Sequence, residues 1–66
     1  MKNRLKIERA IMDLTQDDLA KLIGVSRQTI NSIEKRRYVP STILALKLAR
    51  TFNKSVDEIF ELESDD

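Results

Sequence analysis

Apolar residues recur three and four positions apart along most of the chain, which is the spacing of an amphipathic helix. Alternation at a period of two, which indicates strands, is absent except at the chain ends. The pattern predicts a helix capped by Asn3 that runs to about Asp13, helices at about 16–23, about 27–35 and about 42–52, and a short helix after Ser55. Residues 61–66 either add a short strand or fray. The expected fold is a compact all-α domain of five helices over residues 1–66.

Turn and cap residues separate these helical patterns. The chain contains one glycine and one proline, so few residues favour turns. Thr15 and Asp18 have the spacing of a capping box, Ser26 is an expected N-cap, and Gly24 can adopt the left-handed conformation that ends a helix. The apolar faces are expected to contain Leu5, Ile7, Ala10, Ile11 and Leu14, then Leu19, Leu22 and Ile23, then Ile30 and Ile33.

Composition excludes several classes of site. The chain contains no cysteine and no histidine, which excludes disulfides and thiolate or imidazole metal sites. No apolar run approaches the roughly 20 residues that cross a bilayer, and no signal-peptide core follows Met1. We therefore expect a cytoplasmic protein with no cofactor, no metal, no membrane association and no evident small-molecule ligand.

Charge is divided unevenly along the chain although the formal net charge is only +1. Residues 1–54 hold all twelve Lys and Arg and five acidic residues, a net charge of +7, whereas residues 55–66 hold six acidic residues and no base, a net charge of −6. A basic body favours a polyanionic partner, and the acidic end is expected to face away from it. The alternative is that both kinds of charge only solvate a small helical protein.

Residues 15–37 read TQDDLAKLIGVSRQTINSIEKRR, which is two short helical patterns joined at Gly24-Val25-Ser26. The second pattern exposes polar side chains near its start and is followed by a run of three cations. A helix that enters the major groove needs side chains that hydrogen-bond base edges near its start and cations where it passes the phosphates. The segment therefore predicts a DNA-binding helix-turn-helix at about 16–35.

The chain resembles the Cro and lambda-repressor-like helix-turn-helix family, often called the Xre family, from Asn3 through Phe60. The specific part is LTQDDLAKLIGVSRQTINSIE, followed by YVPSTILALKLARTFNKSVDEIF. The resemblance implies a regulator that binds double-stranded DNA. We expect a repressor that occupies a palindromic operator as a homodimer, with recognition helices about 34 Å apart on successive major grooves.

The resemblance also assigns base-reading positions. Arg27 and Gln28 match the positions that most often read bases, and Ser32 lies one turn further along the same face. Arg can bind guanine O6 and N7, and Gln can bind adenine N6 and N7. Thr29 and Asn31 would contact a thymine methyl, a base edge or a phosphate, although an exposed polar helix face explains them nearly as well.

Other residues match positions that bind the DNA backbone. The resemblance implies a phosphate contact from Gln16, whose alternative is an exposed helix-start residue. Lys35, Arg36, Arg37 and Tyr38 follow the recognition helix and are expected phosphate contacts, or else a solvated basic run. Ser26 and Ser41, with Thr42, lie at helix starts where hydroxyl groups either contact phosphate or only cap the helix. In this family the position of Arg36 is commonly glycine, so Arg36 either adopts a strained left-handed conformation or the helix ends differently.

Two charged residues are expected to be structural. Arg9 lies four residues after Leu5 and Glu34 lies four after Ile30, so both fall at the inner edges of their helices and need partners. The resemblance implies that Arg9 and Glu34 form an ion pair that ties the first helix to the recognition helix. Glu8 occupies a position where the family often has leucine, and the sequence leaves its direction open.

A dimer surface far from the recognition helix is expected near the acidic end. The candidates are Phe52, Val56, Ile59, Phe60 and Leu62, with ordinary core packing as the alternative. A different function, that of a helical protein-interaction or antitoxin-like module, would use the basic face to bind an acidic protein. An enzyme is not expected, because no serine has an imidazole base and no glycine-rich phosphate loop exists. RNA binding is disfavoured because three aromatic residues leave few stacking platforms.

Overall fold

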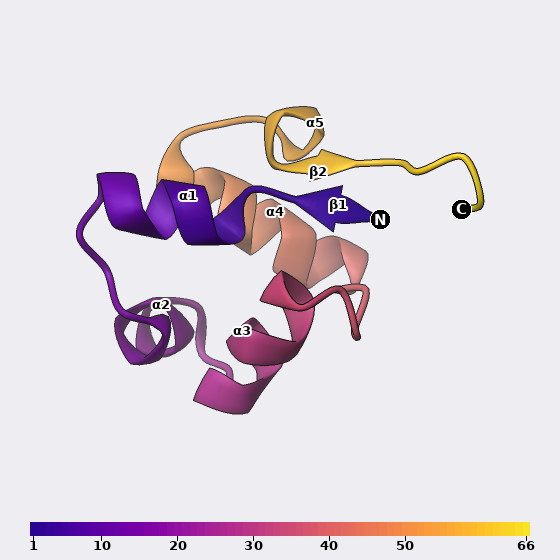
Figure 1. Ribbon diagram of the computed structural model, residues 1–66. Coiled ribbons are helices and arrows are strands. Elements are labelled where there is room, and N and C mark those ends of the chain that lie inside the picture. The colour runs from indigo at the N-terminus through magenta and orange to yellow at the C-terminus, as the bar shows by residue number, and fades with distance from the viewer.

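Five helices and one two-stranded sheet make up the chain in the computed structural model, which describes residues 1–66 (Figure 1). The elements are β1 (Lys2–Asn3), α1 (Leu5–Ile11), α2 (Gln16–Ile23), α3 (Arg27–Glu34), α4 (Thr42–Phe52), α5 (Val56–Ile59) and β2 (Phe60–Glu61). The all-α fold with a short terminal strand is confirmed. None of the five helices combines the length and apolar composition needed to span a bilayer.

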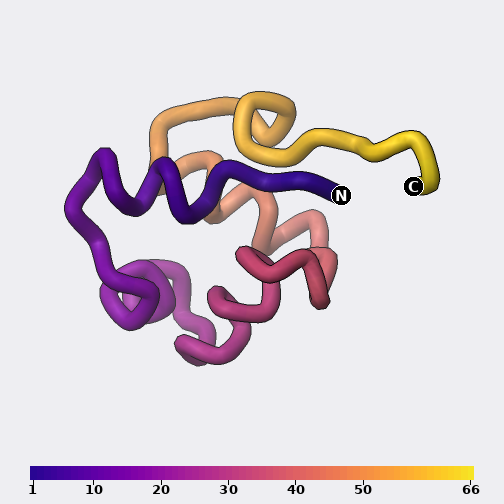
Figure 2. The backbone as a smooth tube through the Cα atoms, viewed as in Figure 1, coloured from indigo at the N-terminus to yellow at the C-terminus, as the bar shows by residue number.

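The small sheet joins the two ends of the chain, which lie side by side in the backbone trace (Figure 2). β1 and β2 are antiparallel, with Lys2 opposite Glu61 and Asn3 opposite Phe60. The backbone N–H of Arg4 extends this pairing by donating to the carbonyl of Ile59 at 2.9 Å. The sheet therefore closes the domain and places the acidic C-terminal residues beside the N-terminus.

The hydrophobic core draws on all five helices. It consists of twelve buried apolar residues: Leu5, Leu19, Ala20, Ile23, Ile30, Ile33, Leu44, Leu48, Ala49, Phe52, Ile59 and Phe60. Partly buried side chains, including Leu14 and Val25, pack against this cluster. Because α2 packs against both α3 and α4, the core fixes the orientation of the helix-turn-helix unit.

Four apolar side chains that were expected inside are exposed. Ile7 is 48% exposed and Ile11 is 69% exposed, because α1 turns Leu5 and Glu8 inward and residues two and six positions after Leu5 fall on its other side. Ala10 is also exposed. Leu22 is 62% exposed because Ala20 takes its place beside Leu19 and Ile23 on the inner face of α2.

Side-chain caps begin the helices largely where the sequence predicts them. Thr15 and Asp18 form a reciprocal capping box on α2, in which each backbone N–H donates to the other side chain at 3.0 Å. Ser55 and Glu58 form the equivalent box on α5. The cap expected for α1 is different, because the N-cap is Arg4 and its side chain makes no capping bond. Asn3 instead accepts from the N–H of Leu5 at 3.2 Å through its side-chain oxygen.

A left-handed residue follows each of the first four helices. These residues are Asp13, Gly24, Arg36 and Asn53. In each case the next backbone N–H donates to the carbonyl five residues earlier, at 2.9–3.0 Å, which is the wide turn of a Schellman motif. The helices end sharply as a result, and α1 stops at Ile11 rather than at Asp13.

Candidate nucleic-acid interface

The turn between α2 and α3 is built from Gly24 and Ser26. Gly24 adopts φ 75°, a left-handed conformation that costs little energy in a residue without a Cβ. Ser26 is the N-cap of α3, and its hydroxyl oxygen accepts from the N–H of Thr29 at 3.2 Å. The Ser26 and Thr29 hydroxyl groups are also 3.0 Å apart. On the inner face, Ile30 and Ile33 are fully buried. These contacts determine which face of α3 meets solvent.

The outer face of α3 presents the polar residues that the sequence assigned to base reading. Arg27 and Gln28 are exposed in its first turn, and neither side chain has a hydrogen-bond or ion-pair partner within the protein. Thr29, Asn31 and Ser32 are half-buried. A shallow groove runs along this face and is lined by Ser26, Gln28, Thr29, Ser32, Arg37 and Tyr38. Four of these lining residues lie on α3 or at its N-cap, and two lie on the loop after α3. All six are candidate DNA contacts, so the candidates from the helix and from the loop share one groove.

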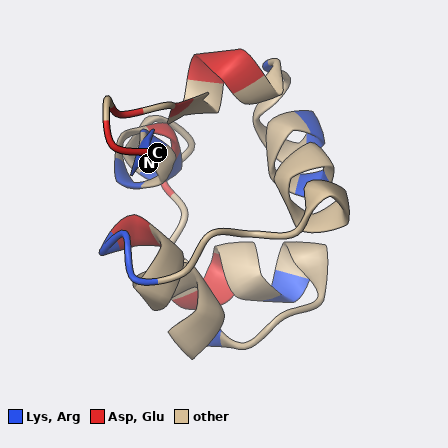
Figure 3. Cartoon of the chain, turned by 90° about the vertical axis from the view of Figure 1, so that its right-hand side faces the viewer, with Lys and Arg blue, Asp and Glu red and all other residues tan.

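The four residues that follow the recognition helix form an exposed basic loop. Lys35, Arg36, Arg37 and Tyr38 all face solvent, and Figure 3 shows the cations of this loop in blue at the end of α3. Arg37 and Tyr38 border the groove on α3. Beyond this loop, Ser41 is the N-cap of α4 and accepts from the N–H of Leu44 at 3.2 Å. The candidate backbone contacts thus flank the outer face of α3.

Arg36 is the residue at which the chain departs from the family pattern. It adopts φ 61°, so the left-handed alternative is the one the structure contains. Its N–H donates to the carbonyl of Ile33 at 3.0 Å, and α3 ends as it would with glycine. A side chain in this conformation costs about 1 kcal/mol relative to glycine. The Arg36 guanidinium lies 3.6 Å from a carboxylate oxygen of Glu63.

The acidic tail returns toward the basic loop. The N-terminal amine of Met1 lies 3.2 Å from Glu63 and 3.1 Å from Asp66, and Glu63 also contacts Arg36. Hydrogen bonding of this amine, as donor, to Asp66 and then to Glu63 raises its pKa above the ordinary value. The expectation that the whole acidic end faces away from the basic surface is wrong for Glu63, because the β1–β2 pair brings it back to the N-terminus.

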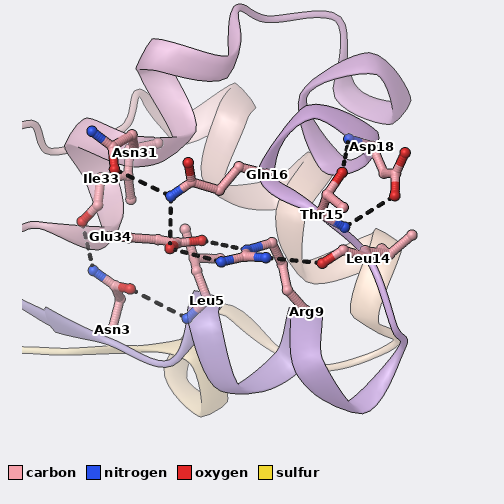
Figure 4. A network of polar contacts seen from close by, with 10 residues as sticks. All are labelled: Asn3, Leu5, Arg9, Leu14, Thr15, Gln16, Asp18, Asn31, Ile33 and Glu34. Carbon is pink, nitrogen blue, oxygen red and sulfur yellow. Dashed lines mark hydrogen bonds and ion pairs between the residues drawn. The ribbon is translucent and has the colours of Figure 1, made fainter.

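A buried polar network connects α1, α2 and α3 (Figure 4). The Arg9 Nε donates to Glu34 Oε2 at 2.6 Å and the Arg9 Nη2 donates to Glu34 Oε1 at 3.1 Å, so the implied ion pair is present. The remaining Arg9 nitrogen donates to the Leu14 carbonyl at 2.9 Å. Hydrogen bonding to Glu34 raises the pKa of Arg9, which remains charged. The Asn3 amide adds a bond to the Ile33 carbonyl at 2.8 Å.

Gln16 belongs to this network in the free protein. Its amide nitrogen donates to Glu34 Oε1 at 3.1 Å and to Asn31 Oδ1 at 3.2 Å. Both amide hydrogens are therefore used inside the protein, and a phosphate contact through this group would require one of these bonds to break. No signal in the sequence indicates the contact of Gln16 with Asn31, because no helical spacing relates residues fifteen positions apart on different helices.

Glu8 is the other polar residue whose surroundings the sequence left open. Only 3% of it is exposed, and its carboxylate lies 3.6 Å from the Nε of Arg4. The position that is often leucine in the family is therefore buried here as well. The acidic side chain of Glu8 is paired with the cation of Arg4, one helical turn earlier.

The dimer candidates divide into core and surface. Phe52, Ile59 and Phe60 are at most 7% exposed and belong to the core cluster, so for these three the alternative of ordinary core packing holds. Val56 is half-buried against the same core, and Leu62 is 77% exposed.

No group of three or more acidic side chains has the spacing to hold a metal ion.

Comparisons with known proteins agree with this geometry. A family model described as Helix-turn-helix matches residues 5–59. An uncharacterized HTH-type transcriptional regulator of Methanocaldococcus jannaschii is 54% identical over 66 residues, with 100% of both chains covered. YgzD of Bacillus subtilis, also named an uncharacterized HTH-type transcriptional regulator, is 43% identical over 65 residues, with 98% of both covered. The structure of the restriction-modification controller protein C.AhdI from Aeromonas hydrophila matches with a TM-score of 0.78 and 32% identity over 86% of each chain.

The family model spans nearly all the helical part of the chain, and the relatives match along almost its full length. The likeness to C.AhdI extends to the arrangement of the helices in space. The chain therefore belongs to the helix-turn-helix family of DNA-binding transcriptional regulators, in the lambda-repressor-like (Xre) group that its sequence resembles.

Proposed function

We propose that this regulator represses transcription by occupying a palindromic operator as a homodimer, with α3 in the major groove of each half-site. The observation that supports this most strongly is the state of Arg27 and Gln28. Both are exposed in the first turn of α3 and have no partner within the protein, while the opposite face of the helix is anchored by Ile30 and Ile33. A rigid helix with unpaired donors at its start fits direct readout of base edges.

In this proposal the two ends of α3 have different roles. Arg27 and Gln28 read bases, with Thr29 and Ser32 further along the groove. Lys35, Arg36, Arg37 and Tyr38 contact phosphates beyond the helix, together with the hydroxyl groups of Ser26 and Ser41. Phosphate contacts fix the register of the helix on the duplex, whereas base contacts select the sequence.

The homodimer follows from the small footprint of one domain. A single recognition helix reads only a few base pairs, and two-fold symmetry doubles the site with half-sites about 34 Å apart. Leu62, which is exposed and apolar, and Val56, which is half-buried, remain the proposed contacts between subunits. A dimer bound to its operator represses by excluding polymerase. The likeness to a protein described as a restriction-modification controller supports a regulatory role.

Selection from a pool of random duplexes, followed by footprinting of the enriched sequence, tests this proposal. We expect one enriched palindrome whose two protected half-sites lie one helical turn apart. Arg27→Ala and Gln28→Ala should each weaken binding to this duplex by about tenfold and leave the fold intact. Enrichment of no sequence, together with capture of acidic polypeptides by the basic face, would instead support a protein-interaction module.

A further inference from the structure

The Gln16 amide has only one orientation that its surroundings allow. Glu34 is an acceptor, and its Oε1 lies 3.1 Å from the Gln16 nitrogen. The opposite orientation would place the Gln16 oxygen against a carboxylate oxygen, where neither atom can donate. Glu34 is itself held by two bonds from Arg9. The ion pair therefore fixes which way the Gln16 amide faces.

The same logic fixes the amide of Asn31, one step further along the network. The second hydrogen on the Gln16 nitrogen is accepted by Asn31 Oδ1 at 3.2 Å. Turning the Asn31 amide would place two NH₂ groups against each other. Figure 4 shows the Asn31 oxygen facing Gln16 and its nitrogen on the side away from Gln16.

The Asn31 nitrogen is free to bind a ligand. It has no partner within the protein. Every buried side-chain nitrogen or oxygen has a partner, so an unpartnered NH₂ group such as this one must be accessible to solvent. Asn31 lies four residues after Arg27 and four before Lys35, which places the three side chains along one face of α3. The side chains of all three residues offer hydrogen-bond donors. Arg27 and Lys35 have no side-chain acceptor, and the side-chain oxygen of Asn31 is turned toward Gln16.

We propose that Asn31 binds DNA only as a donor, to an acceptor atom of the duplex, and that Gln16 is a positioning residue that sets this polarity. The inference rests on the proposed function of α3. A free Asn can pair with adenine through both N6 and N7, which requires its oxygen as well as its nitrogen. Here the oxygen accepts from Gln16 and is turned toward it. The acceptors available to the Asn31 nitrogen are therefore the N7 of guanine or adenine, guanine O6, thymine O4 and phosphate oxygens. The amide of Gln28 has no partner within the protein, so Gln28 can both donate to a base and accept from one.

Anisotropy of a labelled duplex that carries the enriched sequence provides the first test. We expect Asn31→Ala to raise the Kd by about tenfold, the effect of one lost charge-assisted or base-edge bond. Thr51→Ala on α4 is the matched control: it also removes a side-chain hydrogen bond, from Thr51 Oγ1 to the Lys47 carbonyl, and should leave the Kd unchanged. Equal affinities of wild type and Asn31→Ala would overturn this inference and leave the proposed function standing. Failure of the wild type to bind any duplex would overturn both.

A double-mutant cycle tests the positioning role of Gln16. Gln16→Leu keeps the size of the side chain and removes both donors. We expect it to raise the Kd several-fold in the wild-type background and to have no effect in the Asn31→Ala background, because Gln16 acts through Asn31. The same increase in both backgrounds would mean that Gln16 contacts DNA independently, and would overturn the positioning role.

Modified duplexes distinguish the two sources of acceptor. A base contact predicts that replacing one guanine or one adenine by its 7-deaza analogue, or one thymine by a base without O4, weakens binding by the wild type and not by Asn31→Ala. A phosphate contact predicts this pattern for a single methylphosphonate. Replacing one adenine by purine removes only the N6 amino group, a donor. If that replacement weakened the wild type and not Asn31→Ala, Asn31 would be acting as an acceptor and the inference would be wrong.

Discussion

At the scale of single residues, Arg36 shows how backbone conformation and charge meet at the end of the recognition helix. It occupies a left-handed position at φ 61° and contacts Glu63 at 3.6 Å. The sequence predicted the two alternatives at this position because glycine is usual in the family, but it could not choose between them. The choice depends on the Schellman bonds from Arg36 and Arg37 back to Ile33 and Ser32, which only the folded backbone contains.

Substitutions at Arg36 should measure the strain of its conformation. We expect Arg36→Gly to unfold at higher urea concentration than Arg36→Ala, by a free-energy difference of about 1 kcal/mol. Both variants lose the contact with Glu63, so that contribution cancels. The same pair of substitutions at Lys35, where φ is −83°, should show the opposite order. If alanine were as stable as glycine at position 36, the left-handed conformation would be absent in solution.

Removing either member of the ion pair between Arg9 and Glu34 should destabilise the fold strongly. Each side chain is mostly buried, 14% and 7% exposed, so removing one strands the other away from water. We expect Arg9→Ala or Glu34→Ala to lower the free energy of unfolding by about 3 kcal/mol. The double variant should lose clearly less than the sum, because no stranded charge remains. Wild-type melting of either single variant would contradict this account.

At the scale of elements, the starts of the helices were more predictable than their inner faces. Capping depends on residues three positions apart, such as Thr15 and Asp18, and the sequence shows that spacing directly. The inner face depends on what packs against the helix. In α1 and α2 more apolar positions exist than the core can accept, so Leu22 and Ile11 are exposed while Ala20 is buried. Helical periodicity alone cannot rank such positions.

The two capping boxes should make the protein sensitive to acid. A hydrogen bond from the backbone N–H of Thr15 lowers the pKa of Asp18, and one from the N–H of Ser55 lowers the pKa of Glu58. A lowered pKa stabilises the fold above the ordinary value of about 4 and loses this effect as the pH falls through the folded-state value. We therefore expect the melting temperature to fall on acidification below about pH 4.

Two neutral variants provide the check on this acid sensitivity. Asp18→Asn and Glu58→Gln should each flatten the acid limb of melting temperature against pH measured by circular dichroism. Asp17→Asn, which removes a neighbouring charge outside the capping box, should keep most of the fall in melting temperature at acid pH. An unchanged acid limb in the double variant Asp18→Asn and Glu58→Gln would show that the capping boxes do not contribute.

At the scale of the whole molecule, the chain ends are joined in a way that the sequence did not show. The sequence shows directly that the chain has a basic body and an acidic end. It did not predict that the β1–β2 pair would bring Glu63 and Asp66 to the N-terminal amine and Glu63 to the basic loop. Likewise, the sequence left open whether Phe52, Ile59 and Phe60 belong to a dimer surface or to the core, and their burial places them in the core. Contacts between distant segments decide both cases.

The junction of the termini should loosen in alkali. Hydrogen bonding to Asp66 and Glu63 raises the pKa of the Met1 amine. A raised pKa stabilises the fold below the ordinary value of about 8 and loses this effect as the pH rises through the folded-state value. Carbon NMR of the two carboxylates should report a transition above pH 8. In the variant Glu63→Gln and Asp66→Asn the amine should titrate near its ordinary value, and the same titration in both proteins would refute the junction.

The central claim is that α3 and the basic loop after it form the DNA-binding surface. The most direct measurement is the anisotropy of a labelled duplex titrated with protein at several salt concentrations. We predict that log affinity falls linearly with log salt, and that Lys35→Ala and Arg37→Ala each reduce the slope by about 0.9. Arg27→Ala should weaken binding to the enriched sequence more than to random duplex. An absence of salt-dependent binding by the wild type, or slopes unchanged by both loop variants, would contradict the claim.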